Sequence, residues 1–372
     1  MHIASGDRWA GAEAQLFTLV TQLASEQQLR VAVVLLNDGE LASRLRAAGI
    51  EVSVFDESRL GFLALLRGIH RVLRERRPDL VHTHRQKENI LGALCAWRLG
   101  IPSVRTVHGA PEFAPRGLTK RLLVAFDRWL GRHVQRRVIA VSEDLRDKLL
   151  AHYPAPRLRT IENGIDLEAV RATATPPATL DDAPPGMQHV GIAGRLDPVK
   201  RIDLVLAMAA ELLRRAPQRW RFHVFGEGRL TADLRAQAEA LGIAQAVRFH
   251  GHRSDIGACL AALDVLVMCS DHEGLPMTPL ESIAVGTPVV AHAVGGLVPI
   301  LEGGCGGTLV SDHSPRGYAD AVERTLLAGR DALIARGRER LQHRYSAGAN
   351  AAAVAAMYRE VLRGNSANAG EE

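Results

Sequence analysis

Short apolar runs alternate along the whole chain with stretches long enough to form helices, and this alternation restricts the fold more than any other feature. In the first half, helical patterns such as Ala12–Leu23 and Ser58–Arg76 separate the apolar runs. Strands that alternate with helices form βαβ units and a parallel sheet. The predicted strands of this half are RVAVVLL (30–36), DLVHTH (79–84), PSVRTVH (102–108) and RRVIAVS (136–142).

A second series of the same kind follows a break at Thr173–Gln188, which is rich in Pro, Ala and Thr and has no periodicity. A chain of 372 residues fits two domains, because single domains cluster near ~100–200 residues. The second series has strands HVGIAG (189–194), RFHVFG (221–226), AVRFHG (246–251), DVLVMCS (264–270) and TPVVAHAV (287–294). We therefore expect an α/β protein of two doubly wound domains, 1–172 and 189–346, joined by a linker at 173–188 and followed by a closing helix and tail at 347–372.

Charge is unevenly distributed between the two halves. Residues 1–160 contain 25 Lys and Arg against 16 Asp and Glu, and the remainder contains 21 against 25. A basic half attracts phosphates, anionic lipid or nucleic acid, and net charge does not choose among them. Arginine on ordinary solvated surfaces explains the excess equally well.

Cysteines and hydropathy indicate the compartment. Cys95, Cys259, Cys269 and Cys305 have no CxxC spacing, so neither a zinc site nor a disulfide framework is predicted, and a reducing cytoplasm fits best. The sequence has no signal-peptide pattern and no run of ~18 apolar residues. Membrane contact is therefore expected to be peripheral, at the inner face of a plasma membrane.

The segment DHEGLPMTPLESIAVGTPVVA (271–291) is the strongest functional signal. Thr278 suits an N-cap and Pro279 the first helical position, and Glu281, three residues after the cap, suits the glutamate of a capping box. The alternative is a diphosphate site, because a strand end, a glycine loop and a helix N-terminus together present N–H groups to an anion. Glu273 and Glu281 would then accept sugar and ribose hydroxyls.

Upstream, GRLDPVKRID (194–203) places Arg195 and Lys200 after a predicted strand. A guanidinium fork and an ammonium near a glycine suit anion binding, although two exposed basic residues in a loop explain the pair as well. FGEG (225–228), with Gly226 and Gly228, is a second glycine loop at a strand end.

GRLDPVKRIDLVL, FGEGRL, FHGHRSDI and DHEGLPMTPLESIAVGTPVVA, in this order, resemble the donor domain of the family 4 retaining GT-B glycosyltransferases, and Glu273 and Glu281 meet the E-x7-E pattern of that family. The resemblance implies two Rossmann-like domains facing across a cleft, with a C-terminal helix crossing back. It implies a hexosyltransferase-type enzyme with a nucleotide-diphosphate sugar as co-substrate and no required cofactor.

The resemblance also implies roles for individual residues. Arg195 and Lys200 would bind the diphosphate and stabilise the departing nucleotide, Glu273 would contact the transferred sugar, and His108 would lie beside that sugar. These four form the expected catalytic set. The expected donor-binding set is Gly11, Gly194, Gly226, Gly228, Gly251, Arg253, Gly274, Leu275, Pro276 and Glu281.

Other N-terminal residues match the family less directly. Ser142, Glu143, Asn163, Gly164 and Asp166 match its VSE and NGID stretches. His82 and His84, in VHTH, end a predicted strand and are candidates for the acceptor side.

The acceptor is expected to be a glycan or a lipid-linked glycan of bacterial surface polysaccharide or lipopolysaccharide. Basic segments at 115–121 and 128–137 could rest on an anionic membrane, although an ordinary amphipathic helix packed on its own sheet explains them equally well. Their apolar neighbours are Phe113, Leu118, Leu122, Leu123, Phe126 and Trp129.

Two departures and two alternatives accompany this prediction. The first strand is only HIAS, so either the first domain has reduced stability or the true start lies upstream. Inside the E-x7-E segment, Met277-Thr278-Pro279 replaces the small or aliphatic residues that are more usual in the family. No Asp-x-Asp ends a strand, so no metal is expected. The alternatives are a nucleotide-sugar epimerase or hydrolase, and a non-catalytic binding protein; a nucleic-acid partner is not expected, because no aromatic-rich basic sheet motif occurs.

Overall fold

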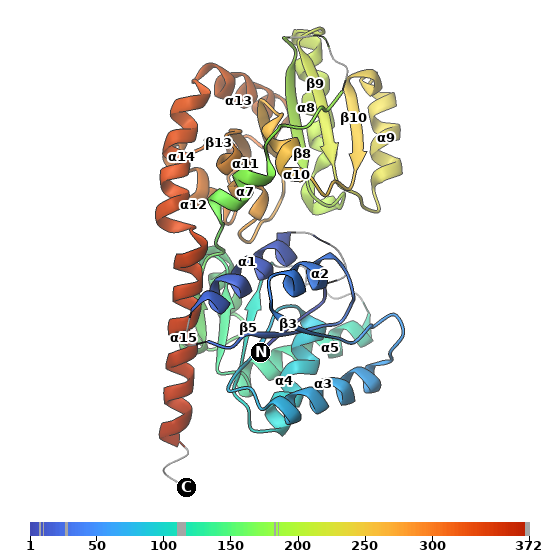
Figure 1. Ribbon diagram of the computed structural model, residues 1–372. Helices are drawn as coiled ribbons and strands as arrows, with labels where there is room; N and C mark the ends of the chain where they lie inside the picture. The colour runs from blue at the N-terminus through green and yellow to red at the C-terminus, as the bar shows by residue number, and fades with distance from the viewer. Residues whose placement is uncertain are drawn as a thin grey trace. The chain divides into compact units, whose positions relative to one another are not determined.

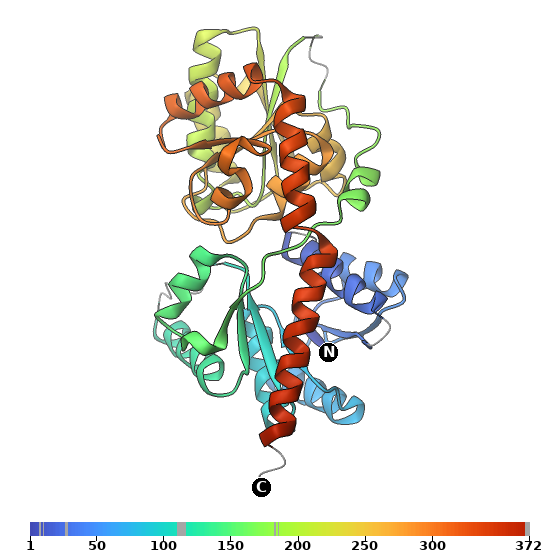
Figure 2. The same cartoon turned by 90° about the vertical axis from the view of Figure 1, so that its left-hand side faces the viewer.

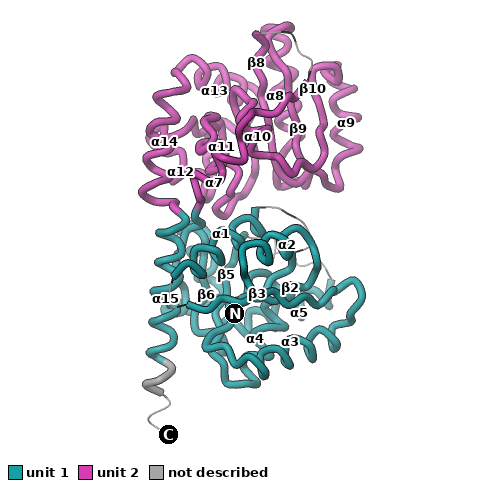
Figure 3. Tube along the Cα trace, viewed as in Figure 1, with its two compact units in different colours: residues 1–164, 347–372 teal, residues 165–346 magenta. Residues whose placement is uncertain are grey.

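The structure is a computed structural model that describes residues 1–6, 9, 11–26, 29–109, 117–181, 184 and 186–368. Two compact units make up the chain (Figure 3). Unit 1 comprises Met1–Gly164 and Ala347–Glu372, and unit 2 comprises Ile165–Ser346. The segment 173–188, which the sequence suggested as a linker, lies within unit 2.

The described part of unit 1 contains a parallel sheet of seven strands in the order β3-β2-β1-β4-β5-β6-β7. The order reverses between β1 and β4, which are neighbours in the sheet, and such a switch point is where ligands bind in doubly wound folds. The strands are β1 (His2–Ala4), β2 (Ala32–Leu35), β3 (Glu51–Val54), β4 (Val81–Thr83), β5 (Ser103–Val107), β6 (Arg137–Ala140) and β7 (Leu158–Thr160).

Unit 2 has a parallel sheet of six strands in its described residues, in the order β10-β9-β8-β11-β12-β13. Its switch point lies between β8 and β11. The strands are β8 (Gln188–Ala193), β9 (Trp220–Phe225), β10 (Val247–Gly251), β11 (Val265–Met268), β12 (Val289–His292) and β13 (Gly307–Val310). The expected pair of doubly wound parallel sheets is confirmed.

Helices cover both faces of each sheet (Figure 1). Those of unit 1 are α1 (Gly11–Ser25), α2 (Glu40–Ala47), α3 (Phe62–Arg76), α4 (Gln86–Arg98), α5 (Leu118–His133), α6 (Glu143–Leu150) and α15 (Ala347–Asn368), with the 3-10 turn η2 (Ala155–Arg157). Those of unit 2 are α7 (Leu167–Thr173), α8 (Ile202–Arg215), α9 (Thr231–Ala240), α10 (Ile256–Ala261), α11 (Met277–Val285), α12 (Leu297–Leu301), α13 (Pro315–Leu327) and α14 (Arg330–Arg344), with the turns η3 (Pro198–Lys200), η4 (Ala244–Ala246) and η5 (Glu302–Gly304).

Helix α15 closes one face of the sheet in unit 1 (Figure 2). Its Ala351, Val354 and Val361 pack with Leu19 and Leu23 of α1 in one apolar cluster. Helices α3 and α4 supply the cluster on the opposite face. The last helix in the chain therefore completes the core of the first unit, as the expectation of a C-terminal helix crossing back requires.

The chain passes between the units twice, and the two passages lie side by side. The Ile165 N–H donates to the Tyr345 carbonyl oxygen at 2.7 Å, and Ile165 forms a parallel bridge with Ser346.

Within the described residues, no helix combines the length and the apolar character needed to span a membrane.

Candidate active site

A charged pair lies at the switch point of unit 2. Lys200 ends η3 in the loop after β8, and Glu273 lies in the loop after β11. Because β8 and β11 are adjacent parallel strands, their carboxyl ends meet at one edge of the sheet. The Lys200 Nζ donates to Glu273 Oε1 at 2.6 Å, and the side chains are 22% and 9% exposed. The structure therefore brings two of the predicted catalytic residues into direct contact.

Ser270, which the sequence analysis did not single out, holds the same carboxylate. Its Oγ donates to Glu273 Oε1 at 2.6 Å, and its backbone carbonyl lies 2.8 Å from His292 Nδ1. Among the described residues, no hydrogen bond is made to the other oxygen, Oε2. This carboxylate is thus fixed through one oxygen, and the second can accept a ligand hydroxyl.

The glycine loops after β8 and β9 pack backbone against backbone. A Cβ atom on Gly226 would lie 2.0 Å from the Gly194 carbonyl oxygen, and one on Gly228 would lie 2.4 Å from the Leu196 carbonyl oxygen. The Gly194 N–H donates to the Phe225 carbonyl at 3.0 Å. These glycines therefore permit the close loop contact that fixes the segment containing Arg195 and Lys200.

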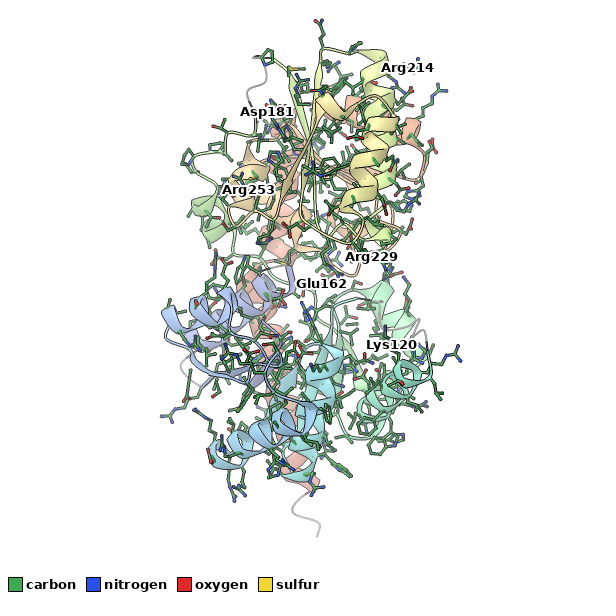
Figure 4. All side chains as sticks on the ribbon, turned by 90° about the vertical axis from the view of Figure 1, so that its right-hand side faces the viewer. Lys120, Glu162, Asp181, Arg214, Arg229 and Arg253 are labelled. Atoms are coloured by element: carbon green, nitrogen blue, oxygen red, sulfur yellow. The ribbon has the colours of Figure 1, made fainter. Side chains whose placement is uncertain are left out.

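Arg195 is near this pair in sequence but extends into solvent. Its side chain is 70% exposed and lies 3.2 Å from Asp197 Oδ2, and Arg229, from the FGEGRL segment, lies 3.6 Å from Oδ1 of the same residue. Figure 4 shows Arg229 in the loop after β9. Such exposed ion pairs contribute little free energy, so both guanidiniums can move to a bound anion.

Arg253 has a different environment, in the loop after β10 (Figure 4). Its Nε and Nη2 donate to the two carboxylate oxygens of Asp255 at 2.7 and 2.6 Å. Gly251, with φ of +70°, accepts a hydrogen bond from the Gly226 N–H at 2.7 Å. The loop 251–255 therefore adjoins the glycine loops, but the Arg253 fork is already occupied by a carboxylate.

The start of α11 differs from the prediction. The helix begins at Met277 with Pro276 as N-cap in extended backbone, and no side chain caps it. Thr278 is therefore the second helical residue, and the predicted capping box at Thr278 and Glu281 is wrong. Pro276 has φ −71°, close to the value of about −65° that the proline ring fixes, and an extended ψ of 142°. The extended ψ keeps Pro276 outside the helix, so the first helical residue is Met277. The first-turn N–H groups remain uncapped by side chains.

Glu281 loses its structural explanation as a result. It lies in the second turn of α11, is half-buried, and makes no hydrogen bond with the described residues. Burial raises the pKa of its carboxyl group to about 7. A carboxyl group held in this way gains hydrogen bonds when a hydroxyl-bearing ligand binds.

Gly295 and Gly296, between β12 and α12, support the Glu273 loop and were not predicted. A Cβ atom on Gly295 would lie 2.0 Å from the Glu273 carbonyl oxygen, and one on Gly296 would lie 2.0 Å from the Gly274 carbonyl oxygen. Gly274 and Leu275 are buried beneath this contact. The adjacent glycines in VGGL were the available sequence signal.

Arg201 ties the two central loops together and was also missed. It has a left-handed backbone with φ of +50°, and its Nη1 donates to Asp271 Oδ1 at 3.1 Å. The Asp271 N–H donates to the Val199 carbonyl oxygen at 2.9 Å. These bonds connect the segments that contain Lys200 and Glu273, so they set the separation of the pair.

In unit 1, His108 directly follows β5 and is half-buried. Burial, with a smaller contribution from Arg85, lowers the pKa of its imidazole to about 4. His108 is therefore neutral at pH 7. Gly11 is the first residue of α1 and is exposed, while residues 7, 8 and 10 before it lie outside the described part of the chain.

The expectation that His82 and His84 face the acceptor is corrected by their burial. They are 0% and 5% exposed, and both nitrogens of each ring have hydrogen-bonding partners inside unit 1. Helix α15, whose Tyr358 contacts His82, covers this position. A strand end alone did not reveal that a distant helix would close over it.

The VSE and NGID residues have local structural roles. The Ser142 Oγ accepts from the Leu145 N–H at the start of α6, and the Asp166 carboxylate accepts from the Ala169 N–H at the start of α7. Of the predicted membrane-facing segment, Phe113, Pro115 and Arg116 lie outside the described residues.

Two groups of side chains in the described residues have the spacing to hold a metal ion. They are His2, His82 and His84 in unit 1, and Asp181, His189 and His223 in unit 2, with ligand atoms within 4.8 Å of one another. Neither includes Lys200 or Glu273. The expectation that donor binding needs no metal stays a prediction.

Comparison with known proteins identifies the family. A model described as glycosyltransferase family 4 matches residues 9–169, and one described as glycosyl transferases group 1 matches residues 188–327. A D-inositol 3-phosphate glycosyltransferase of Kineococcus radiotolerans is 31% identical over 404 residues, covering 97% of this chain and 89% of that protein. The chain belongs to glycosyltransferase family 4. A second relative, D-inositol 3-phosphate glycosyltransferase 2 of Catenulispora acidiphila, is 32% identical over 75% of this chain and 70% of its own length.

Solved structures agree with the GT-B fold of family 4. The Anabaena protein HepE in complex with UDP-glucose has 22% identity and a TM-score of 0.80, covering 97% of this chain and all of that one. The apo lipopolysaccharide outer core galactosyltransferase WaaB has 18% identity and a TM-score of 0.66 over 97% of this chain. The protein is a retaining family 4 glycosyltransferase that uses a nucleotide-diphosphate sugar.

Proposed function

We propose that this family 4 enzyme transfers a sugar from a UDP-sugar to a hydroxyl group of a lipid-linked glycan at an anionic membrane surface. The Lys200–Glu273 pair at the switch point of unit 2 is the observation on which the donor half of the proposal rests. UDP is proposed because the similar HepE structure contains UDP-glucose.

In the proposed donor complex, the diphosphate lies against the uncapped start of α11, with Gly274, Leu275 and Pro276 beside it. Lys200 and the exposed Arg195 guanidinium supply positive charge, and Arg229 adds a third cation from the neighbouring loop. Helix N-terminal N–H groups and cations together favour a bound diphosphate. Gly194, Gly226 and Gly228 keep the two loops close enough for these groups to converge.

The two carboxyl groups would recognise hydroxyls. Glu273 Oε2 accepts from a hydroxyl of the transferred sugar, while Lys200 and Ser270 hold Oε1. Glu281 accepts from the ribose, and the loop with Gly251 and Arg253 lies toward the base. His108 keeps the role that the family implies, a contact with the transferred sugar.

Catalysis then follows from charge. The anomeric C–O bond to the diphosphate breaks, so positive charge develops on the sugar and negative charge on the phosphate oxygens. Arg195, Lys200 and the α11 dipole stabilise the leaving group. The acceptor oxygen bonds to the anomeric carbon on the face that the phosphate leaves, and its proton passes to a phosphate oxygen, which accounts for retention.

The membrane half of the proposal rests on the outer face of α5. This face, called here the α5 apolar face, combines large exposed side chains without an acidic residue: Leu118, Leu122, Leu123, Phe126 and Trp129, at 75, 62, 45, 38 and 41% exposure. The only acidic residue of α5, Asp127, is buried against Arg105. Trp97 of α4 extends the face through an edge contact with Trp129 at 6.1 Å.

Basic residues border the α5 apolar face. Lys120, Arg121 and Arg132 are exposed, and Figure 4 marks Lys120 on this helix. Apolar side chains that enter the interface, flanked by cations that contact anionic headgroups, are the features of an interfacial helix. This arrangement favours a lipid-linked acceptor over a small soluble one such as the inositol phosphate in the names of the curated relatives.

Donor binding is tested by thermal stabilisation with UDP-, GDP-, ADP- and CMP-sugars. We expect a shift with one UDP-sugar that is lost in Glu273→Gln and Lys200→Met. Stabilisation by another nucleotide would contradict the choice of UDP, and no shift with any donor would contradict a glycosyl-donor site. Transfer assays then compare lipid-linked glycans with inositol phosphate, and activity on inositol phosphate alone would overturn the acceptor.

Membrane binding is tested by sedimentation with vesicles containing phosphatidylglycerol. Leu122→Glu should reduce the bound fraction, whereas Leu327→Glu, at an exposed leucine of unit 2 with 82% exposure, should not. Equal binding by both variants would exclude the α5 apolar face as the contact.

A further inference from the structure

A chain of hydrogen-bonded rings lies in unit 1 behind His108. His2 is in β1, and His82 and His84 are in and just after β4, at the switch point of the sheet. Residues 2 and 82 are direct partners in the parallel pairing of β1 and β4, so their side chains share one face. Tyr358 of α15 covers this face.

Three of the imidazole rings are joined in line. His84 Nδ1 lies 3.3 Å from His108 Nε2, and His84 Nε2 lies 3.0 Å from His2 Nδ1. The planes of His84 and His108 are tilted by 23° with ring centres 5.6 Å apart, and those of His2 and His84 by 16° with centres 5.3 Å apart. Each centre-to-centre distance equals the N···N distance plus the two ring radii. The rings therefore meet edge to edge along N–H···N bonds and do not stack.

Tyr358 joins this row to His82. Its hydroxyl lies 3.3 Å from His2 Nε2 and 2.5 Å from His82 Nδ1, and His82 Nε2 lies 2.8 Å from Thr106 Oγ1. The hydrogen bonds therefore run without a break from His108 to the threonine hydroxyl.

The rings in this chain are neutral. Burial is the first cause that lowers the pKa of His2, His82 and His84 well below the usual value for histidine, and burial raises the pKa of the Tyr358 phenol. A neutral imidazole donates through one nitrogen and accepts through the other. The bond made by each ring therefore determines the bond made by the next.

Only two arrangements satisfy every bond. If Tyr358 donates to His82, it accepts from His2 Nε2–H, and His84 and His108 must also be protonated on Nε2. If Tyr358 donates to His2, every bond reverses, and all four histidines are protonated on Nδ1. A mixed arrangement would leave a buried phenol proton without an acceptor, which is costly.

We propose that Tyr358 acts as a positioning residue that fixes all four histidines in the Nε2–H tautomer, so that His108 presents the lone pair of Nδ1. The phenol is a stronger donor than a neutral imidazole, and its shorter contact is the one to His82, which selects the first arrangement. The consequence for catalysis rests on the proposed function: His108 would accept a hydrogen bond from a donor-sugar hydroxyl.

Tautomers are measured directly by long-range proton–nitrogen correlation on protein labelled with ¹⁵N-histidine. We expect His2, His82, His84 and His108 each to show protonated Nε2 and bare Nδ1. A mixture of tautomers among the four rings would overturn the proposal. A bound metal ion at one per chain, whose removal by a chelator changes these signals, would also overturn the proposal, because His2, His82 and His84 have the spacing to hold a metal ion.

Tyr358→Phe tests whether the phenol sets the direction. Without it, His2 Nε2–H has no acceptor, so the row should reverse and His108 should become protonated on Nδ1, although none of its contacts is changed. Tyr318→Phe is the matched control, because its buried hydroxyl contacts His313 Nδ1 at 2.9 Å in unit 2. An unchanged His108 tautomer in Tyr358→Phe would overturn the proposal.

Turnover separates the tautomer chain from the function proposed for His108. We expect Tyr358→Phe to lower kcat about tenfold, because the transition state would lose one hydrogen bond to His108 and about that ratio corresponds to the free energy of one such bond. If the tautomer of His108 reverses but neither Tyr358→Phe nor His108→Ala changes kcat, the chain is supported and the role of His108 toward the sugar is refuted.

Discussion

Replacing Lys200 with methionine removes one partner of a buried ion pair while keeping most of the side-chain volume. Removing one member of a fully buried pair costs ~3–5 kcal/mol. Here Lys200 is 22% exposed, and Ser270 still donates to Glu273 at 2.6 Å, a charge-assisted bond that retains part of the stabilisation. We therefore expect the free energy of unfolding of unit 2 to fall by about 1–3 kcal/mol.

The interaction itself is isolated by a double-mutant cycle. Glu273→Gln makes the buried carboxylate neutral, so adding Lys200→Met to it should cost less than Lys200→Met alone, with a coupling energy of about 1–2 kcal/mol. Urea unfolding, combined with hydrogen exchange on peptides of both units, provides the measurement, so that each variant is followed in the unit that contains it. Lys148→Met is the control, because Lys148 pairs with Asp144 at 2.7 Å on an exposed helix surface, and such a pair contributes ~0.3–0.5 kcal/mol.

Two results would refute this reasoning. If the single variants add within ~0.5 kcal/mol, Lys200 and Glu273 do not interact in solution. If Lys200→Met matches the Lys148→Met control, the pair is solvated and Glu273 is not held for a ligand. A UDP-sugar should in turn stabilise the wild type more than Lys200→Met, since the ammonium is proposed to contact the diphosphate.

Three further predictions concern stability. Arg105→Met should lower the free energy of unfolding by ~3–5 kcal/mol in urea titrations, because Asp127, 2.8 Å away, would be a buried charge without its cation; a loss below ~1 kcal/mol would contradict this. Burial raises the pKa of Glu281 to about 7, so the folded state keeps a proton that the unfolded state releases near pH 4.5. The free energy of unfolding should therefore fall, by at most ~3 kcal/mol, as pH rises from 4.5 to 7. Glu281→Gln should remove this part of the pH dependence. Gly226→Ala should lower the melting temperature, since its Cβ would lie 2.0 Å from a carbonyl oxygen at φ of +122°, while Gly61→Ala, with open space, should change it little.

The sequence was sufficient for the central strands of both sheets. Their apolar runs are long because both faces are covered by helices. The strands that it did not predict, β3, β7 and β13, are edge strands with shorter or more polar runs, such as Glu51–Val54. Edge position depends on pairing over the whole sheet, which a local window does not contain.

The short HIAS strand illustrates the same limit. Its length suggested a weak first domain, yet β1 is an inner strand paired with both β2 and β4. Its stability comes from segments 30 and 80 residues away, so its own length was a poor guide.

Within the candidate site, spacing predicted which loops meet but not how side chains are arranged. The order of the motifs placed Lys200 and Glu273 at adjacent strand ends, and the structure adds their direct contact. Arg201 bonds Asp271, 70 residues further along the chain, and Ser270 bonds Glu273 three residues away in a loop whose conformation the local sequence does not determine. The burial of His82 depends on Tyr358, 276 residues further along the chain, so sequence position alone suggested exposure.

Because α15 belongs to unit 1 but follows unit 2 in the chain, the two units differ in when synthesis can complete them. All of unit 2, Ile165–Ser346, leaves the ribosome before the helix that closes the unit 1 core. Until then, Leu19 and Leu23 of α1 lack their apolar partners from α15. A chain that is released after residue 346 should therefore hold a folded second unit and an open first unit, which makes the interval before α15 docks the period when a chaperone would be needed most.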